Sequence, residues 1–426
     1  MSTSKQFLRY AGDVNIDKMI ITSAPTGVYQ DITGQMLRIE IFEDIFSTFI
    51  HGTVTLKESH DFMNLFPLVG EEYLDIKITT PTIPGGQIAG KFHIYKMTDK
   101  VKTGDKVQMY ELHFVSIEAL SDLNKKISKV YSGRISDLIA PFIVDPHDGI
   151  ESTKNTIVEN TRNSIKYISN FWSPIKNLKF LADNAISSTQ SPSFLFFENR
   201  NGFNFVSLER LYKNPSIIEF TKDNYTRDTV PLGGNALNPM EDYKRIGAMT
   251  IPTAYNYMDK IRSGQLASRL VSYDSTKKTY TVRNYSSLSR FGSQIHLNPY
   301  PTFSDKAPVR VAAKQIIYNR AFETFTSFGD TTNAKIVQER QAFLAMAESQ
   351  KIVITVPGRA DYTVGQCVDV LLYRDRPVDK KQNQDEMKDK MYSGKYLIAA
   401  INHTIGTDGH ECSMELVKDS IIRSLK

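Results

Sequence analysis

Cysteine, tryptophan and long apolar runs are all scarce in this chain of 426 residues. There are two cysteines, Cys367 and Cys412, and one tryptophan. The cysteines form no CxxC motif, so we expect two buried thiols rather than a metal or catalytic site. No stretch reaches the roughly 18 apolar residues of a membrane-spanning helix. Residues 1–15 also lack the basic-then-apolar pattern of a signal peptide, so we expect synthesis in a cytoplasm and no membrane insertion.

Charge of either sign is moderate. The net charge is +5, with 23% charged and 41% hydrophobic residues, as in an ordinary soluble globular protein. This mild charge does not identify a nucleic-acid binder. The length suits about two to four domains, and the 21 tyrosines and 23 phenylalanines favour β-rich structure and large interfaces.

Catalytic signatures are missing as well. The patterns GxSxG, GxxxxGK[ST], GxGxxG and HExxH do not occur. The eight histidines are scattered, and His403 and His410, on either side of a predicted hairpin turn, are expected at the surface or in the turn. No Cys/His cluster is expected. The sequence therefore predicts no catalytic, cofactor-binding or metal-binding residues and a protein that is not an enzyme.

Acidic residues leave one catalytic alternative open. Glu43-Asp44 and Glu71-Glu72 are adjacent pairs, but neighbours on a strand face opposite sides and make poor acid–base partners. Glu58 and Asp61 could meet at a cleft. A hydrolase with a loose carboxylate pair is therefore left open as an alternative.

Residues 1–117 are predicted to form mainly strands. Apolar and polar residues alternate over 36–42, 73–79, 92–97 and 109–115, and glycine and proline separate these runs. This pattern predicts a first antiparallel β-barrel.

Residues 118–235 are predicted to form a middle α+β module. Ser173-Pro174 is an expected helix N-cap with proline at the first helical position, and Trp172 is an expected core residue at that helix entrance. Gly202 supplies the positive φ of a hairpin turn. The predicted elements are helices over 117–130, 135–142 and 174–187, a hairpin over 194–206 and a linker at 231–234.

Residues 236–426 return to strands and are predicted to form a second β-barrel with a large insertion at about 286–350. The expected elements are a hairpin over 266–283, a helix over 334–349 packed on its own barrel, a strand over 351–356 and an exposed charged loop over 375–390.

An internal repeat supports two similar barrels. Three segment pairs recur in the same order: 69–76 with 364–370, 90–95 with 394–399, and 110–116 with 414–420. Gly90 and Leu112 are 22 residues apart, as are Gly394 and Leu416. A possible earlier match pairs 52–54 with 264–266. Three copies of such a chain would present six similar barrels around a three-fold axis.

This organisation resembles the T4-type phage baseplate central hub. The segments that carry the resemblance are 69–81, 174–205, 259–285, 362–370 and 392–418, including the ending Tyr-Leu-Ile-Ala-Ala-Ile-Asn-His at 396–403. The resemblance implies a mainly β fold with α+β insertions, in which each of three chains contributes two tail-tube-like barrels and a middle module to a pseudo-hexameric ring.

The resemblance also implies a function and partners. The implied protein is a structural homotrimer in the virion tail baseplate, assembled in the host cytoplasm. It joins a three-fold central spike to a six-fold tail tube or tube initiator. Tape measure protein and DNA would pass through its channel, with DNA a transient passenger. Because the chain stops at Lys426, shortly after the second barrel, the puncturing device is expected on a separate chain. One alternative function is a baseplate-associated cell-wall hydrolase. Another is the hub of a bacterial contractile injection system, which has the same architecture.

Overall fold

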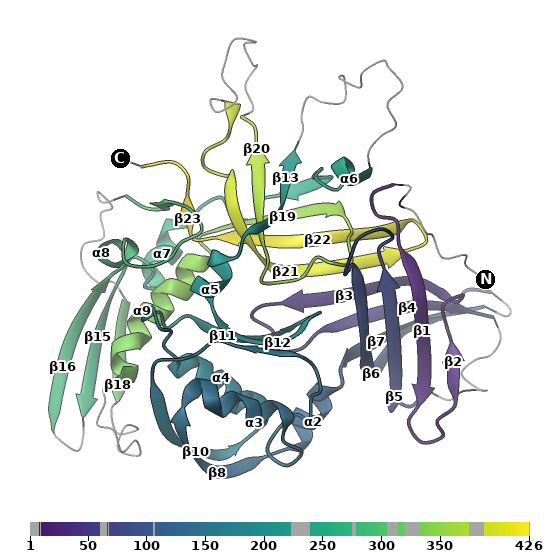
Figure 1. The fold of residues 1–426 in the computed structure, drawn as a ribbon, viewed down its shortest axis with the longest axis horizontal. Helices are drawn as coiled ribbons and strands as arrows, with labels where there is room; N and C mark the ends of the chain where they lie inside the picture. Colours follow the sequence, from purple (N-terminus) through teal and green to yellow (C-terminus); the bar gives the residue numbers. More distant parts are fainter. Residues whose placement is uncertain are drawn as a thin grey trace.

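One sheet of thirteen strands runs through the centre of the molecule. The computed structural model describes residues 8, 10–59, 66, 68–104, 107–222, 239–274, 278–304, 314–319, 332–374 and 387–425. The strands follow the order β14-β19-β22-β21-β3-β4-β7-β6-β5-β1-β2, and β20 and β13 attach beside β21. In Figure 1, β21 and β22 cross the centre, β1 and β5 lie on the right, and a smaller α+β unit lies below. The fold is therefore mainly β, as predicted.

The first part of this sheet is built from the N-terminal segment. Its strands are β1 (Asn15–Ser23), β2 (Tyr29–Asp31), β3 (Met36–Asp44), β4 (His51–Glu58), β5 (Glu72–Thr79), β6 (Gln87–Lys102) and β7 (Gln108–Ser116). Every pair among them is antiparallel. Alternate side chains are buried along β4, β5 and β7, which is why period-two patterning located them in the sequence.

The second part of the sheet comes from the C-terminal segment. Its strands are β13 (Ser216–Lys222), β14 (Ala248–Thr250), β19 (Gln350–Pro357), β20 (Cys367–Leu372), β21 (Gly394–Gly406) and β22 (Gly409–Lys418). Charged residues 375–386 of the predicted loop lie outside the described residues.

The two parts have the same pairing plan. The order β1-β5-β6-β7-β4-β3 matches β13-β20-β21-β22-β19-β14, and the corresponding strands follow one another in the same sequence order. One pairing differs, because β13 runs parallel to β20 whereas β1 runs antiparallel to β5. The three repeated segments are therefore confirmed as equivalent strands. The earlier match was wrong: residues 52–54 lie in β4, whose equivalent is β19, whereas Gly264 precedes β15.

The two parts join edge to edge through β3 and β21. Residues Ala400–Gly406 pair antiparallel with Arg38–Asp44, while the beginning of β21 pairs with β20. With β4 and β21 on its two edges, β3 has no free edge for β1 or β2. The expected closure into separate barrels is accordingly not seen among the described strands.

The middle α+β unit lies beneath this joint (Figure 1). It contains α2 (Glu118–Asn124), β8 (Ile127–Arg134), η1 (Ile135–Leu138), α3 (Ile139–Val144), β9 (Thr156–Val158), β10 (Ser164–Trp172), α4 (Pro174–Asn184), β11 (Phe194–Asn199), β12 (Gly202–Ser207) and α5 (Leu208–Lys213). The Ser173 hydroxyl caps α4 by accepting from the Lys176 N–H, as predicted. The predicted helix over 117–130 was wrong beyond Asn124, because residues from Ile127 pair with β10.

A long insertion separates β14 from β19. It contains α7 (Tyr257–Arg262), β15 (Ala267–Asp274), β16 (Thr279–Ser286), α8 (Ser287–Phe291), β17 (Tyr300–Pro301), β18 (Lys314–Asn319) and α9 (Thr332–Ala347); α6 (Pro239–Asp242) precedes β14, and β23 (Ser420–Ile421) pairs with β17. The predicted hairpin and the predicted long helix are both present. Phe343 and Ala347 of α9 are buried in the same core as the second part of the sheet, so this helix packs on its own half.

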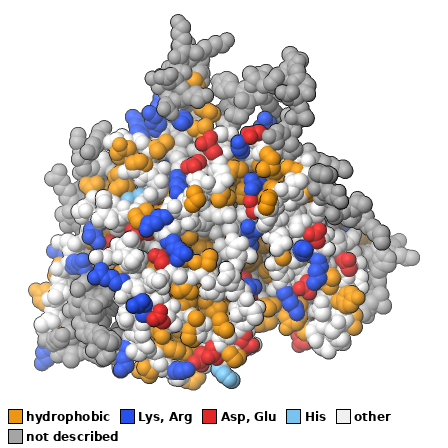
Figure 2. Space-filling view, viewed as in Figure 1, with side chains coloured by type: hydrophobic (Ala, Val, Ile, Leu, Met, Phe, Trp, Pro, Cys, Tyr) orange, Lys and Arg blue, Asp and Glu red, His pale blue; other side chains and the backbone are white. Residues whose placement is uncertain are grey.

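The surface mixes residue types. Lys and Arg side chains are interspersed with Asp and Glu over the face in Figure 2, in keeping with the small net charge. None of the helices in the described ranges is long and apolar enough to span a membrane.

Candidate functional site: a buried polar junction

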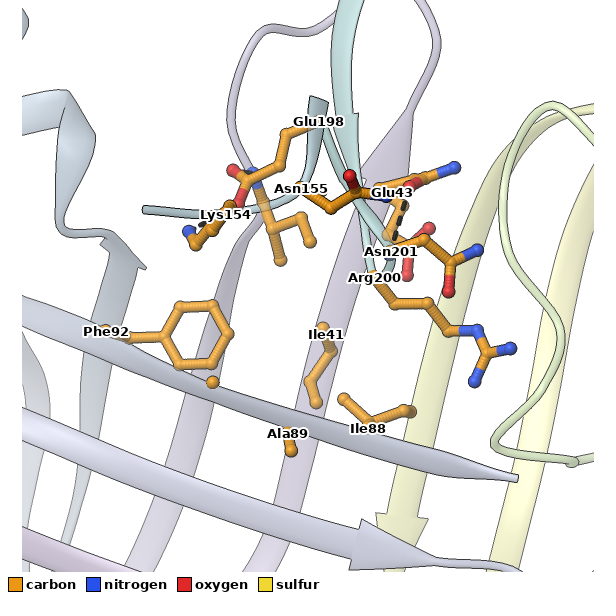
Figure 3. A pocket seen from close by; sticks show the side chains of 14 residues that line it. Ile41, Glu43, Ile88, Ala89, Phe92, Lys154, Asn155, Glu198, Arg200 and Asn201 are labelled. Atoms are coloured by element: carbon orange, nitrogen blue, oxygen red, sulfur yellow. Dashed lines mark hydrogen bonds and ion pairs between the residues drawn. The ribbon is translucent and has the colours of Figure 1, made fainter. Parts of the chain in front are cut away.

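A small cavity lies between the first half of the sheet and the middle unit. Its volume is about 130 Å³. In Figure 3, Glu43, Lys154, Glu198 and Arg200 surround it on one side, while apolar side chains including Phe92 line the other. The cavity has room for a few water molecules and is smaller than the roughly 300–1,000 Å³ of small-molecule sites.

Glu198 ties the middle unit to the first half of the sheet. It is the fifth residue of β11, and both of its carboxylate oxygens are used. Oε2 accepts from the Ile50 N–H at 3.0 Å and from the Ser116 hydroxyl at 2.6 Å, and Oε1 lies 2.6 Å from Lys154 Nζ. Burial raises the pKa of Glu198, which Lys154 partly offsets. Its role is to satisfy buried donors from two segments.

Lys154 supplies the positive charge beside Glu198. Its ammonium lies 2.6 Å from Glu198 and 2.7 Å from Glu118, and both carboxylates are almost fully buried. Burial lowers the pKa of Lys154, but the two carboxylates outweigh burial and the net shift is upward. The lysine therefore stays charged, and removing it would leave two buried acids without a counter-ion.

Glu43 links the first half of the sheet to the second. It lies on β3, is 2% exposed, and accepts hydrogen bonds from the Thr363 hydroxyl and from the Val364 N–H. Burial raises its pKa to about 7, against these hydrogen bonds and the charge of Arg200. Asp44 points to the other face and accepts from the Phe46 N–H, so the two neighbouring acids diverge as predicted.

Arg200 is the one side chain of this junction that reaches both halves of the sheet. It lies in the β11–β12 turn, and its Nη1 donates to the carbonyls of Gly85, Gln87 and Ala360 at 2.9, 3.0 and 2.7 Å. Burial lowers the pKa of Arg200. Arg200, Glu43, Lys154 and Glu198 together make the polar contacts that hold the middle unit and the two halves of the sheet against one another, and we call these four residues the polar junction.

The other acids singled out in the sequence have structural roles or are not described. Glu72 accepts from the Val69 and Gly70 N–H groups at the start of β5. Glu58 is buried on β4, and Asp61 lies outside the described residues. Neither Glu58 nor Glu72 lines the cavity beside Glu43.

Two further predictions concern aromatic and thiol side chains. Trp172 packs on Tyr167 and Phe180 at the entrance of α4, as a core residue should. Cys367 and Cys412 are both buried and unbonded to each other, as predicted.

The prediction for the two hairpin histidines was wrong. His403 and His410 are 0% and 4% exposed, and with Cys412 they form a cluster in the β21–β22 hairpin. Burial lowers the pKa of His403 to about 3 and lowers that of His410 well below its usual value. The missed signal was the pairing itself: His410 and Cys412 are two residues apart on one strand, and His403 lies opposite Cys412, so all three share a face.

The residues of the polar junction gave no comparable signal. Lys154, Glu198 and Arg200 come from segments distant in sequence from Glu43, and only the tertiary fold brings them together. Each taken alone resembles a solvated surface charge.

Comparison with known proteins finds matches to the fold but not to the sequence. No protein-family model and no curated protein matches the sequence. The fold matches a 43 kDa tail protein of prophage MuSo2 from Shewanella oneidensis, with a TM-score of 0.55, 10% identity, and 95% of this chain and 99% of that chain covered. It also matches a tail protein from Neisseria meningitidis MC58, with a TM-score of 0.54, 12% identity, and 94% and 96% covered.

A prophage tail protein from Listeria monocytogenes EGD-e aligns with a TM-score of 0.47 and 10% identity over 94% of each chain. The first two matches show that the chain shares the fold of these two tail proteins, one of them from a prophage, over nearly its whole length.

Proposed function

We propose that this chain is a structural, non-enzymatic hub of a contractile tail baseplate, acting as a homotrimer. The observation that carries the proposal is the repeated pairing plan of the sheet. Two equivalent strand sets in one polypeptide let three chains present six similar surfaces. The shared fold with the two tail proteins over nearly the whole chain supports the same assignment.

The physical task of such a hub is to join two symmetries. The six repeated surfaces would receive a six-fold tail tube or its initiator on one side of the ring. The insertion between β14 and β19 occurs once per chain, so it would keep the three-fold identity that a central spike requires. The channel would pass the tape measure protein and then DNA, and the site of action would be the virion tail.

The joint between β21 and β3 supplies a template for the contact between chains. By the repeat, the second half of β6 corresponds to the second half of β21, and β14 corresponds to β3. Beyond His93, β6 pairs with β7 alone among the described strands, and β14 pairs with β19 alone. These two edges would pair between neighbouring chains as β21 and β3 pair within one. Such pairing also covers strand edges that would otherwise promote aggregation.

This joint can be tested by a disulfide. The Gly406–Arg38 pair inside the chain corresponds to Lys102 and Thr250. The double variant Lys102→Cys, Thr250→Cys should give covalent dimers and trimers on a non-reducing gel after mild oxidation. Lys57→Cys with Thr250→Cys is the matched control, because Lys57 lies on β4, which has neighbours on both edges, and should stay monomeric on the gel.

Solution mass is the decisive measurement for the trimer. Light scattering should give three times the chain mass of 48.3 kDa, and particle images along the axis should show six similar densities. Interfaces of about 2,000 Å² or more are expected to hold such a ring. A stable monomer at micromolar concentration, alone and with its spike, would contradict the proposal.

The polar junction does not favour the hydrolase alternative. Glu43 and Glu198 face a cavity, but their oxygens accept from backbone and side-chain donors that hold the fold together. A zymogram of the purified chain on peptidoglycan should show no clearing, and a lytic band would overturn the structural assignment.

A further inference from the structure

Three atoms with lone pairs meet inside the β21–β22 hairpin. His403 Nδ1 and His410 Nε2 are 3.0 Å apart, and Cys412 Sγ lies 3.2 Å from the first and 3.5 Å from the second. All three side chains are buried. We propose that His403, His410 and Cys412 bind one zinc ion, or a metal ion of similar softness, as a structural staple of this hairpin.

The spacing of the three atoms is that of ligands sharing one ion. Zinc–nitrogen bonds of about 2.0–2.1 Å and zinc–sulfur bonds of about 2.3 Å, at tetrahedral angles, place ligand atoms roughly 3.3–3.6 Å apart. The observed distances fall within a few tenths of an ångström of these values. A small outward rotation of each side chain is sufficient to admit the ion.

The hairpin itself fixes the ligand geometry. His403 pairs directly with Cys412, and Ile405 pairs with His410. Side chains two residues apart on a strand share a face, and directly opposed residues on adjacent strands are neighbours. The ligands are therefore held by the backbone ladder rather than by mobile loops, which lowers the entropy cost of binding.

Two glycines close the site around His410. A Cβ on Gly358 would lie 2.2 Å from the His410 ring, so the chain needs glycine there to leave room for the imidazole. The Gly358 N–H donates to the His410 carbonyl at 2.8 Å, and the His410 N–H donates to the Gly12 carbonyl at 2.9 Å. The N-terminal segment and the end of β19 thus cover the cluster, and the metal would enter during folding.

The donor set selects the class of ion. A thiolate and two imidazoles suit zinc and other borderline or soft transition metals, whereas magnesium and calcium take oxygen ligands. The cluster supplies three ligands from the described residues, which leaves a fourth tetrahedral position. Of the outer nitrogens, His410 Nδ1 has no hydrogen-bond partner in the described part of the chain, whereas the His403 ring lies near the Tyr362 backbone. We therefore expect an affinity roughly 10–100-fold below that of sites whose histidines are supported by an acceptor.

A purely hydrogen-bonded cluster is the competing explanation of this geometry. With neutral imidazoles and a thiol, the shared contact between His403 and His410 requires one ring to donate and the other to accept. The accepting ring then carries its proton on the outer nitrogen, as a metal-bound ring would. A metal ion instead gives all three converging lone pairs a partner.

Cobalt(II) provides a test on the full-length chain. The protein, free of any affinity tag, is unfolded with a chelator, dialysed, and refolded with one equivalent of cobalt(II). We expect a thiolate-to-cobalt charge-transfer band, the visible bands of a tetrahedral ion, and displacement of both by one equivalent of zinc. Cys412→Ser should lose the charge-transfer band. Cys367→Ser should keep it, because that buried thiol donates instead to the Leu211 carbonyl.

The outcomes of this experiment either support the proposed metal site or overturn it. Absence of the band in the wild-type chain, together with less than one zinc retained per chain after refolding with zinc, would overturn it. Persistence of the band in Cys412→Ser, or its loss in Cys367→Ser, would also overturn it, because the ligand would then be another thiol. If Cys412→Ser does not fold, protection of one of the two thiols from alkylation by zinc in the wild-type chain, with Cys412 identified by mass spectrometry, answers the same question.

Discussion

The two halves of the central sheet share a pairing plan but are stabilised differently. The first half packs around a core made mostly of its own residues, which include Ile39, Leu74 and Leu112, while Ala360 and Ile405 of the second half complete it. The second half shares one core with the middle unit and with α9, through Phe197, Phe343 and Tyr396. The first half therefore draws its core mainly from the repeated strands, whereas the second depends on segments that have no counterpart in the repeat.

The chain connections between equivalent strands also differ between the two halves. Six residues, 45–50, join β3 to β4, whereas residues 251–349 lie between the equivalent strands β14 and β19. Loop-closure entropy grows slowly with length, so a sheet tolerates a long insertion at a strand connection. The comparison teaches that the strand ladder is the repeated feature, while cores and connections have diverged around it.

The largest expected effects come from equivalent core leucines. Leu112 on β7 and Leu416 on β22 are both 0% exposed and occupy matching positions in the repeat. Replacing either by alanine should cost about 2–5 kcal/mol of unfolding free energy, because a buried cavity forms. Because β3 and β21 share a ladder, chemical denaturation should remain a single transition in both variants. Two separate transitions in Leu112→Ala would show instead that the halves unfold independently.

The joint between the halves should give stability a pH dependence. The pKa of Glu43 is raised from 4.5 to about 7 in the folded chain. Between these values the folded state binds the proton and the unfolded state does not, so stability falls as pH rises through this window. The total loss attributable to Glu43 is about 3 kcal/mol at about 1.4 kcal/mol per pH unit.

The variant Glu43→Gln removes that titration. The unfolding free energy of this variant, measured with denaturant at pH 5 and pH 8, should increase relative to that of the wild type as the pH rises. The amide still offers an oxygen to the Val364 N–H. Parallel curves for the two proteins across this range would contradict a buried, proton-binding Glu43.

Arg200 should matter next, because it connects both halves to the middle unit. Arg200→Met removes three hydrogen bonds to carbonyls at residues 85, 87 and 360, at an expected cost of about 2–3 kcal/mol for a half-buried charged donor. Arg210→Met, at an exposed position on α5, is the matched control and should stay within about 0.5 kcal/mol of wild type. Equal effects of the two changes would mean that the junction does not hold the halves together.

Sequence patterns located the elements whose signal is local. Alternation placed β5, β7 and β19, Ser173-Pro174 placed the start of α4, and Gly202 placed a hairpin turn, where its φ is 122°. Ile127 was assigned to a helix because apolar spacing suits either element over so few residues, and pairing with β10 decides it. Long-range pairing is not encoded in a local window.

The polar sites were harder for the same reason. The hairpin that carries His403 and His410 was expected, but which of its faces is buried depends on β3 and on the segment near Gly12, both distant in sequence. Lys154 and Glu198 are opposite charges 44 residues apart, with no periodicity to relate them. Charge pairs of this kind become visible only once the three segments are packed.

The smallest expected effect concerns two turns, one in each half of the sheet, that are capped in the same way. At the start of β5, Glu72 accepts from the Val69 N–H at 2.9 Å, and just before β20, Gln366 accepts from the Thr363 N–H at 3.0 Å. Each side chain caps the turn three residues before it, one with a carboxylate and one with an amide. If the repeat requires an acceptor rather than a charge, Glu72→Gln should cost no more than about 1 kcal/mol, whereas Glu72→Ala should cost about 1.5–3 kcal/mol.

Denaturant unfolding of both variants measures this difference, with Glu71→Gln at the exposed neighbouring position as the control. Equal losses from Glu72→Gln and Glu72→Ala would show that the first half needs the charge itself. In that case a charged acceptor would stabilise the first turn and a neutral acceptor the second. The halves would then be equivalent in their backbone hydrogen-bond ladders but not in the side chains that cap the turns.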